Sequence, residues 1–285
     1  MTTSGSRRGD GSGAVNRGVI PTGTTALFSI IGSPVVQVVA PRIFNEHFAE
    51  HGHDAVLVAF DLESDAVGAY FDAMRGTANF RGSFVTVPHK REATRHMDEL
   101  TPRSSALGVV NVVKRVDGRL VGDLTDGLAF LAAARSHGFD PGGARVAMIG
   151  GGGTATAIAH ACAEQGVAEL VLSVRNATRH DDMRRVVASV PNAPRLSFDL
   201  DSLEGFDLVI NATTVGMNGD PNMPHPVDTL DSSSLVGEVV TLPRVTPWLE
   251  AALDRGCRIQ HGADMAAAQL QLVGPWWGLD VIPGD

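Results

Sequence analysis

The sequence predicts an α/β protein with two domains, an N-terminal αβα domain followed by a domain built on a parallel sheet. The chain has 285 residues, about the length of two ordinary domains, and 44% of them are hydrophobic, which is enough for a core in each. Short apolar runs alternate with stretches of helical periodicity along most of the chain, the pattern of βαβ units. Four consecutive glycines follow one of these runs at residues 150–153.

The first 125 residues contain one series of such units. Residues 1–19 are rich in Gly, Ser and Arg without hydrophobic periodicity, and we expect them to form a mobile tail. From Thr24 onward, the runs TALFSII, DAVLVAF and SFVTV predict strands, and PRIFNEHFAEHG and DAVGAYFDAMRG between them predict helices. Asp117 and Gly118 separate two alternating runs, which predicts a tight β-hairpin. We therefore assign residues 20–125 to a first domain that this hairpin closes.

A connecting helix and a second series follow. DGLAFLAAARSHG has apolar residues at helical spacing and ends in glycine, so it predicts a helix that links the domains. The second series consists of ARVAMIG, TATAIAHACAEQG, ELVLSV, a helix around DDMRRVVASV, and the strand FDLVINA. PWLEAALDRG and MAAAQLQLVGPWWG predict two closing helices with the strand CRIQ between them. We assign residues 126–245 to the linker helix and second domain, and expect residues 246–285 to pack back on the first domain.

Composition argues against several classes of protein. The formal charge of -9, from 23 basic and 32 acidic side chains, disfavours nucleic acid as a partner. No apolar run reaches the length of a membrane helix, and the first residues lack the apolar stretch of a signal peptide. Cys162 and Cys257 are far apart in apolar surroundings, which indicates reduced thiols in a cytoplasmic protein. His47 and His51 share a helix face but have no third ligand near them in sequence, so we expect no metal site.

The glycine run lies in a context that gives it a function. In VAMIGGGGTATAIAHA, a strand leads into the glycines and a helix follows them. Gly150 permits a sharp turn, Gly152 lets the backbone approach a pyrophosphate, and the start of the helix offers free N–H groups to the anion. The small Ala157 lets the helix lie close to the sheet. The sequence therefore predicts a Rossmann domain that binds a dinucleotide.

The end of the next strand bears on the choice between NAD and NADP. An acidic residue there accepts from the ribose of NAD, whereas arginine binds the 2′-phosphate of NADP. The segment SVRNATRH contains Arg175 and Arg179, and the first acidic residues are Asp181 and Asp182. This pattern favours NADP and leaves NAD open.

Several short motifs, in order and at matching spacing, resemble the shikimate dehydrogenase family, which includes shikimate and quinate 5-dehydrogenases. They are VTVPHK at residues 85–90, GVVN at 108–111, GDLTDG at 122–127, the glycine loop, NAT at 211–213, and Gly262 with Gln269. The likeness covers nearly all of residues 25–280. It implies a substrate domain and an NADP domain with a cleft between them, and reversible reduction of 3-dehydroshikimate to shikimate, or of a related ring ketone. A place in aromatic amino acid biosynthesis would follow.

The resemblance also implies roles for individual residues. Lys90 and Asp126 match the catalytic pair of the family, and three positions match substrate contacts, namely Thr86, Asn111 and Gln269. The positions that match cofactor contacts are Gly150, Gly151, Gly152, Gly153, Thr154, Arg175, Arg179, Val239 and Gly262. Chemistry agrees for Lys90, because an ammonium group can stabilise the negative charge that develops on a carbonyl oxygen and can supply its proton. Which member of the pair is the formal base stays open.

The chain departs from the family where the substrate carboxylate binds. Members usually have two serines in a stretch like HSxSP, and here the corresponding positions are Val38 and Ala40. Phe84 and Thr241 stand where asparagine and tyrosine are common. We therefore expect the cofactor site and catalytic pair to be kept while the substrate differs from shikimate, unless nearby donors such as Ser33, Gln37 or Thr86 replace the serines.

Two alternatives follow from this departure. One is a relative that acts on another substrate, such as quinate with NAD, and the other is a ligand sensor without turnover. For the assembly, the sequence leaves monomer and homodimer open.

Overall fold

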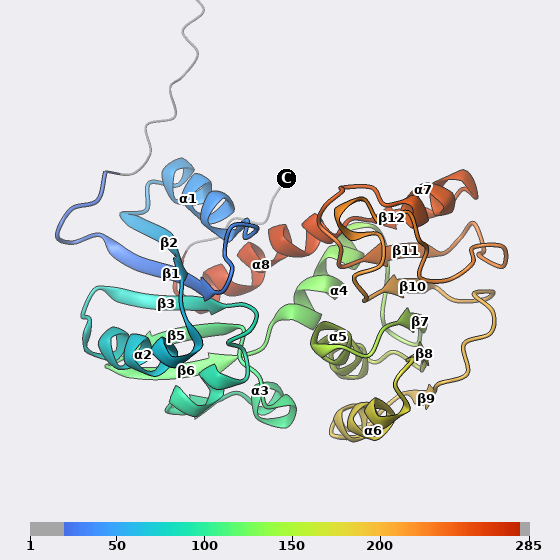
Figure 1. The fold of residues 1–285 in the computed structure, drawn as a ribbon, viewed down its shortest axis with the longest axis horizontal. Helices are drawn as coiled ribbons and strands as arrows, with labels where there is room; N and C mark the ends of the chain where they lie inside the picture. The colour runs from blue at the N-terminus through green and yellow to red at the C-terminus, as the bar shows by residue number, and fades with distance from the viewer. Residues whose placement is uncertain (1–19, 280–285) are drawn as a thin grey trace, which may run out of the picture.

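The computed structural model describes residues 20–279, so the tail predicted at residues 1–19 lies outside the described residues. Two sheets form the centres of two domains, which lie side by side in Figure 1. The first sheet has the strand order β2-β1-β3-β5-β6-β4. Its strands are β1 (Ala26–Gly32), β2 (Ala55–Asp61), β3 (Phe80–Val85), β4 (Glu99–Leu100), β5 (Val112–Val116) and β6 (Arg119–Asp123).

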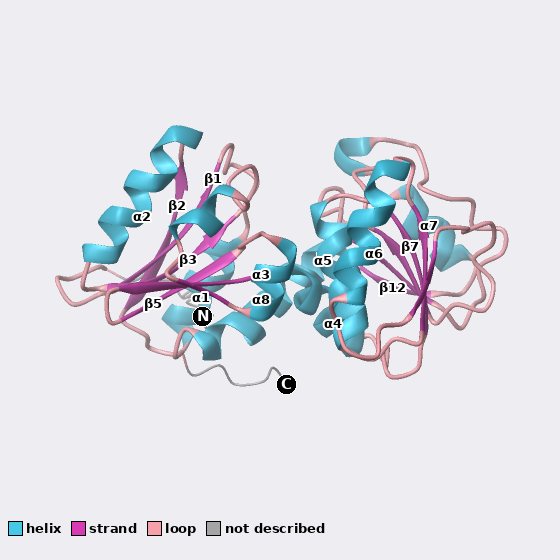
Figure 2. Ribbon diagram, turned by 90° about the horizontal axis from the view of Figure 1, so that it is seen from below, coloured by secondary structure: helices cyan, strands magenta, loops and turns pink. Residues whose placement is uncertain are grey.

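Strand β1 shows how the first domain is layered. It pairs in parallel with β2 and β3, and its side chains alternate between two cores because successive residues of a strand point to opposite faces. Phe28 and Ile30 join a core with α1 (Ala40–Glu50), and Ile31 joins one with α2 (Val67–Gly76) on the opposite face. Helices therefore cover both faces of this sheet (Figure 2).

The antiparallel part of the sheet contains the predicted hairpin. Strands β5 and β6 pair across Asp117 and Gly118, whose φ values of 50° and 80° suit the tight turn that the Asp-Gly pair predicts. Strand β5 also pairs antiparallel with β3, and β4 pairs in parallel with β6. The short helices of the first domain are η1 (Ser64–Ala66), η2 (Glu92–His96) and α3 (Pro102–Leu107).

The second sheet is entirely parallel, with the strand order β12-β11-β10-β7-β8-β9. Its strands are β7 (Arg145–Ile149), β8 (Glu169–Ser173), β9 (Arg195–Ser197), β10 (Leu208–Asn211), β11 (Leu235–Glu238) and β12 (Arg258–Gln260). Chain order runs outward from β7 to β9 and then, from β10 to β12, outward in the other direction. This is the Rossmann order, in which ligands bind at the carboxyl ends of the strands where the order reverses.

Helices cover both faces of this second sheet. One core contains residues of α4 (Asp126–Ser136), α5 (Gly153–Glu164) and α6 (His180–Ala188), and the other contains residues of α7 (Pro247–Asp254). The short helices are η3 (Ala177–Arg179) and η4 (Met217–Gly219). Helix α4 joins the domains, and α8 (Gly262–Trp276) lies against it and returns to the first domain (Figure 1). Within residues 20–279, no helix is long and apolar enough to cross a membrane.

The structure differs from the expected assignment of residues 246–285. Helix α7 and strand β12 belong to the second domain, because Trp248 and Leu249 are buried in its core and β12 pairs with β11. Of this C-terminal segment, α8 and the residues just after it pack on the first domain. The sequence analysis also missed β4, β9, β11 and α3, since segments of two to six residues are too short to show a period.

Candidate active site

A cleft of about 960 Å³ lies between the domains at the carboxyl ends of their parallel strands. Residues from both domains line it, although they are far apart in sequence. All the residues that the sequence analysis proposed for catalysis, substrate or cofactor contact are among them, namely Thr86, Lys90, Asn111, Asp126, Gly150, Gly151, Gly152, Gly153, Thr154, Arg175, Arg179, Val239, Gly262 and Gln269.

The loop after β3 positions Lys90. The Val87-Pro88 peptide is cis, and the backbone N–H of His89 donates to the Thr86 carbonyl at 3.0 Å. The His89 ring is buried, and its Nε2 lies 2.8 Å from the Leu62 carbonyl oxygen. The carbonyl of Lys90 in turn accepts from the N–H of Val110 at 2.9 Å. These contacts hold the Lys90 backbone on both sides and leave its side chain in the cleft.

Asp126 is the partner of Lys90. It is the first residue of α4, and its Oδ2 accepts a hydrogen bond from Lys90 Nζ. Its Oδ1 accepts from the Asn111 amide at 2.7 Å. The exposed fractions of the two charged side chains are 25% for Lys90 and 10% for Asp126, so the pair is partly shielded from water and still accessible from the cleft. An ammonium group in this position can exchange a proton with a substrate oxygen.

A chain of hydrogen bonds extends from Asp126 to α8. The Asn111 side-chain oxygen accepts from the Thr125 backbone N–H at 2.7 Å, and the Thr125 hydroxyl donates to Gln269 Oε1 at 2.8 Å. Asn111 precedes β5, Thr125 precedes α4, and Gln269 lies in α8. A chain of hydrogen bonds thus runs from Gln269 through Thr125 and Asn111 to the carboxylate that holds Lys90.

The glycine loop faces this pair from the second domain. Gly150 has a φ of +133°, and a Cβ on it would lie 2.7 Å from the Ala212 carbonyl oxygen, so no other residue fits without displacing the backbone. A Cβ on Gly152 or Gly153 would meet nothing within 4 Å. No side chain caps the N-terminus of α5, whose first N–H groups have no intrahelical acceptor. The loop therefore forms an open cradle of donors suited to a pyrophosphate.

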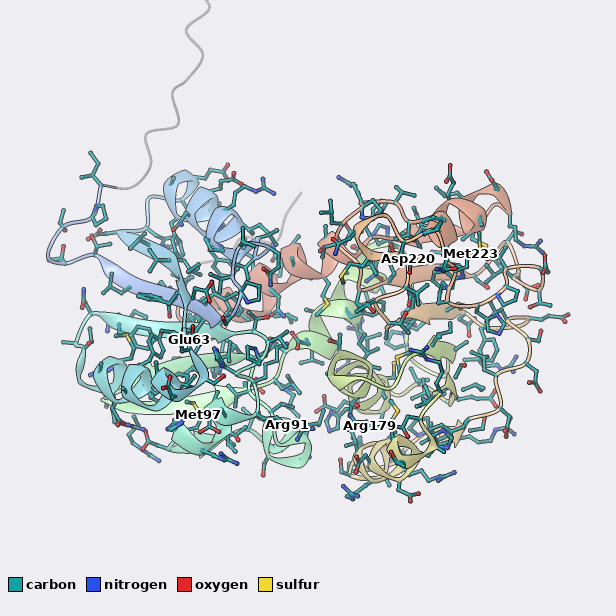
Figure 3. The ribbon with its side chains drawn as sticks, viewed as in Figure 1. Glu63, Arg91, Met97, Arg179, Asp220 and Met223 are labelled. Carbon is teal, nitrogen blue, oxygen red and sulfur yellow. The ribbon has the colours of Figure 1, made fainter. Side chains whose placement is uncertain are left out.

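Two arginines lie beside the cradle, as the sequence analysis proposed. Arg175 is exposed and lines the cleft just after β8. Arg179 Nε donates to the Gly151 carbonyl at 3.2 Å, and its Nη1 lies 3.7 Å from Asp182. Figure 3 shows Arg179 at the edge of the second domain that faces the first. Asp126 is the one acidic side chain among the described residues that line the cleft, and it is paired with Lys90, so the two arginines face no acidic neighbour of the cleft lining and fit the 2′-phosphate of NADP.

Val239 and Gly262 line the same half of the cleft. The N–H of Val239 donates to the Asn211 carbonyl at 3.1 Å, which extends the pairing of β10 with β11 by one residue. A Cβ on Gly262 would lie 2.1 Å from the Val240 carbonyl oxygen, so α8 begins here only because this residue is glycine. Sequence reasoning missed Met217, Met223 and Met265, which also line the cleft, since their segments carry no recognisable motif.

A buried carboxyl group lies just behind this wall. Glu238 is fully buried, and its Oε2 accepts from the Thr246 hydroxyl at 2.9 Å. Its Oε1 makes no well-formed hydrogen bond within the described part of the chain, although the Asn211 side chain lies near enough to favour the charged carboxylate. Burial raises the pKa of Glu238 to about 7, and the hydrogen bond from Thr246 offsets part of this rise. The sequence analysis gave no indication of this residue.

Part of the cleft wall that the first domain supplies is apolar. Val38, Ala40 and Phe84 line it, and all three belong to or pack against the core that α1 and α8 share with β1. Phe84 is anchored by edge-to-face contacts with Phe44 and Trp277, at centroid distances of 5.2 and 4.8 Å. At these three positions the resemblance to the family led us to expect polar residues. The hydrophobic residues found there are packed into the core of the first domain.

Comparison with known proteins gives a consistent result. Residues 30–113 match the family model for the shikimate dehydrogenase substrate binding domain. The shikimate dehydrogenase (NADP(+)) of Moorella thermoacetica is 33% identical over 253 residues, which cover 86% of this chain and 85% of that protein.

Two solved structures have similar folds. The ligand-free 5-ketofructose reductase of a Gluconobacter strain superposes with a TM-score of 0.83 at 27% identity, covering 90% of this chain and 95% of that one. Shikimate 5-dehydrogenase from Thermus thermophilus, in complex with NADP(H) and shikimate, gives a TM-score of 0.80 at 27% identity, covering 91% and 95%. With the identity to the Moorella enzyme over most of both chains, these findings show that the chain belongs to the shikimate dehydrogenase family.

Proposed function

We propose that the protein is an NADP-dependent dehydrogenase that reversibly reduces a ketone, with Lys90 and Asp126 acting on the substrate oxygen. One observation carries this proposal: the ion pair between Lys90 of the first domain and Asp126 at the start of α4 lines the same cleft as the glycine loop of the second domain. The relatives named as NADP(+)-dependent shikimate dehydrogenases support the reaction class and the cofactor.

Residues of the second domain would hold the cofactor. The open N–H groups at Gly152 and Gly153 suit the pyrophosphate, and Arg175 and Arg179 suit the 2′-phosphate. When bound, NADPH supplies the hydride that reduces the carbonyl carbon. The alternative with NAD would leave both arginines without a phosphate partner.

Residues of the first domain would carry out the proton transfer. As the carbonyl becomes a hydroxyl, the Lys90 ammonium stabilises the charge on the oxygen and donates a proton to it. Asp126 holds the ammonium group in place through Oδ2, while Asn111 holds Asp126 through Oδ1. In the reverse direction the pair accepts the hydroxyl proton. Thr86 and Gln269 would contact the remaining oxygens of the substrate.

Lys90→Met tests the proposal. The variant keeps the length of the side chain and removes the proton donor, so we expect kcat to fall about 10²- to 10⁴-fold while the dissociation constant for NADP stays within threefold of wild type. Hydride transfer is followed by absorbance of reduced cofactor, with 3-dehydroshikimate and 5-ketofructose as probes. Cofactor affinity is measured by calorimetry.

Lys114→Met provides the matched control. Lys114 lies on β5 and does not line the cleft, so its loss should leave both quantities unchanged. Retention of wild-type kcat by Lys90→Met would contradict the catalytic role. Tight NADP binding without hydride transfer to any probe would instead support the ligand sensor.

We further infer a cytoplasmic enzyme that is a monomer or a homodimer. Both cysteines are buried free thiols, and burial raises the pKa of Cys162 to about 12, so this thiol stays protonated and unreactive. Light scattering coupled to size exclusion distinguishes the two assemblies.

A further inference from the structure

We infer that the substrate carries no negative charge and is an uncharged polyhydroxy ketone instead of a carboxylate. The inference rests on the proposed function, because it concerns the substrate of the same cleft. It follows from the charges, the wall and the free hydrogen-bonding groups of the first domain.

On the side of the cleft away from the glycine loop, the positive and negative side chains neutralise each other. Lys90, Asp126, Arg175 and Arg179 are the charged residues among those described as lining it. The two arginines stand beside the glycine loop, where they suit the cofactor phosphate. On the first domain, the positive charge of Lys90 is already compensated by Asp126 in direct contact. A substrate carboxylate there would lose its hydration without gaining a free counter-ion, which is strongly unfavourable.

The wall beside the pair provides no substitute for a cation. Its side chains at Val38, Ala40 and Phe84 cannot donate hydrogen bonds, and the neighbouring Gln37 is neutral and already donates from its amide to the Pro34 carbonyl at 2.9 Å. Helix α1 begins at this wall, but its N-terminus has few free donors. Pro41 has no N–H group, and those of Arg42 and Ile43 donate to the Val39 carbonyl at 3.1 and 3.2 Å.

The polar groups left over are all neutral. The Thr86 hydroxyl has no hydrogen bond to another described residue, and the Gln269 amide uses its oxygen on Thr125 and keeps its NH₂ group available. Asn111 donates one N–H to Asp126 and keeps a second. Neutral donors around a lysine suit the hydroxyls and carbonyl of a sugar-like ketone. The fold shared with 5-ketofructose reductase, whose named substrate is an uncharged sugar, agrees with this chemistry.

Two matched pairs of probes test the inference. Methyl shikimate differs from shikimate in having its carboxylate masked as an ester, and L-sorbose differs from 5-ketogluconate in having a hydroxymethyl group in place of the carboxylate. Dissociation constants are measured by calorimetry with the cofactor-free protein and with the NADP-loaded protein. We expect the uncharged member of each pair to bind at least tenfold more tightly.

A double variant tests the role of the wall. Val38→Ser with Ala40→Ser adds two hydroxyl donors where the wall is apolar, so shikimate binding should improve about 10²- to 10⁴-fold, while methyl shikimate changes little. Val36→Ser is the matched control, because Val36 lies in the same loop, is 92% exposed and does not line the cleft. A thermal melt confirms that each variant folds.

The outcomes separate this inference from the proposed function. Tighter binding of the charged member in both pairs, or failure of both uncharged probes to bind, would overturn the inference whether or not turnover occurs. Preferential binding of the uncharged probes without hydride transfer would uphold it and count against the proposed function. Turnover that depends on Lys90, together with tighter binding of the carboxylates, would support the proposed function and overturn the inference.

Discussion

At the scale of single residues, two contacts hold the Lys90 ammonium group in place. Lys90 contacts Asp126, and Asp126 is held by Asn111 on its other oxygen. Removal of one member of a buried charged pair is costly, because the other stays desolvated without compensation. The contacts therefore keep the Lys90 ammonium at one point of the cleft, as proton transfer requires.

Glu238 provides a prediction on pH. Because burial raises its pKa from the ordinary 4.5 to about 7, the folded protein binds more protons than the unfolded chain between these values. The free energy of unfolding should therefore fall as the pH rises from 4.5 to above 7, by up to about 3 kcal/mol from this group. Glu238→Gln should flatten that slope in urea unfolding measured from pH 5 to 8.

Glu169→Gln is the control, because the pKa of Glu169 is shifted in the opposite direction. Hydrogen bonds from Arg145 and Arg195 lower the pKa of Glu169, so its contribution to stability is present at neutral pH and is lost as the pH falls through that lowered pKa. A slope between pH 5 and 8 that is the same in Glu238→Gln and wild type would show that Glu238 is not the buried titrating group.

At the scale of elements, the cofactor half of the cleft is made from strand ends. Strand β7 ends at the glycine loop, β8 ends before Arg175, and β10 ends at Ala212, whose carbonyl oxygen approaches Gly150. In a parallel sheet these ends lie at one edge, so short loops suffice to assemble a nucleotide site.

The turn from β8 into η3 should determine cofactor preference. Replacing both Arg175 and Arg179 with Ala removes two cations beside the cradle, and we expect NADP affinity to fall at least tenfold while NAD affinity changes less than threefold. Calorimetric titration with each dinucleotide measures this.

Arg184→Ala is the control for this change. Arg184 lies on α6, pairs with Asp181 at 3.0 Å and does not line the cleft. Equal losses for NAD and NADP in the double variant would show that the arginines support the loop and do not recognise a 2′-phosphate.

At the scale of the whole molecule, two helices join the domains. Helix α4 leads from the first domain into the second, and α8 runs back beside it. The residue after α8, Trp277, is buried among Phe28, Phe44 and Phe84, and its Nε1 donates to the Val113 carbonyl at 3.0 Å. Trp277 thus completes the core of the first domain from a helix that starts in the second.

Trp277→Ala should therefore destabilise the first domain. Loss of a buried tryptophan costs about 3–5 kcal/mol, and here it also leaves the Val113 carbonyl without its donor. Urea unfolding gives the change. Trp276→Ala is the control, since its half-buried ring packs only at the margin of the same core and should cost less. A loss below about 1 kcal/mol in Trp277→Ala would mean that the C-terminal segment does not hold the first domain together.

The sequence was most informative where a pattern is local. Alternating runs located β1, β2 and β3, Asp117-Gly118 located the hairpin, and the four glycines located the cofactor loop. Local patterns failed for β11, a four-residue strand that includes Gly237. They located α7 and β12 but did not show that these two elements join the second domain. Short segments of this kind are placed by the core that they cover and not by their own periodicity.

The tertiary structure alone showed which distant residues meet and what surrounds them. Lys90 and Asp126 were paired by resemblance in the sequence, but their contact, and the bonds through Asn111 and Thr125 to Gln269, arise because α4 and α8 pack together beside the first sheet. Likewise, Val38 and Ala40 were visible as substitutions, and only their position in an apolar wall beside a neutralised lysine indicates an uncharged substrate. The order and type of residues along the chain determine local secondary-structure preferences. The net charge around a side chain depends on every group within a few ångströms, and only folding brings those groups together.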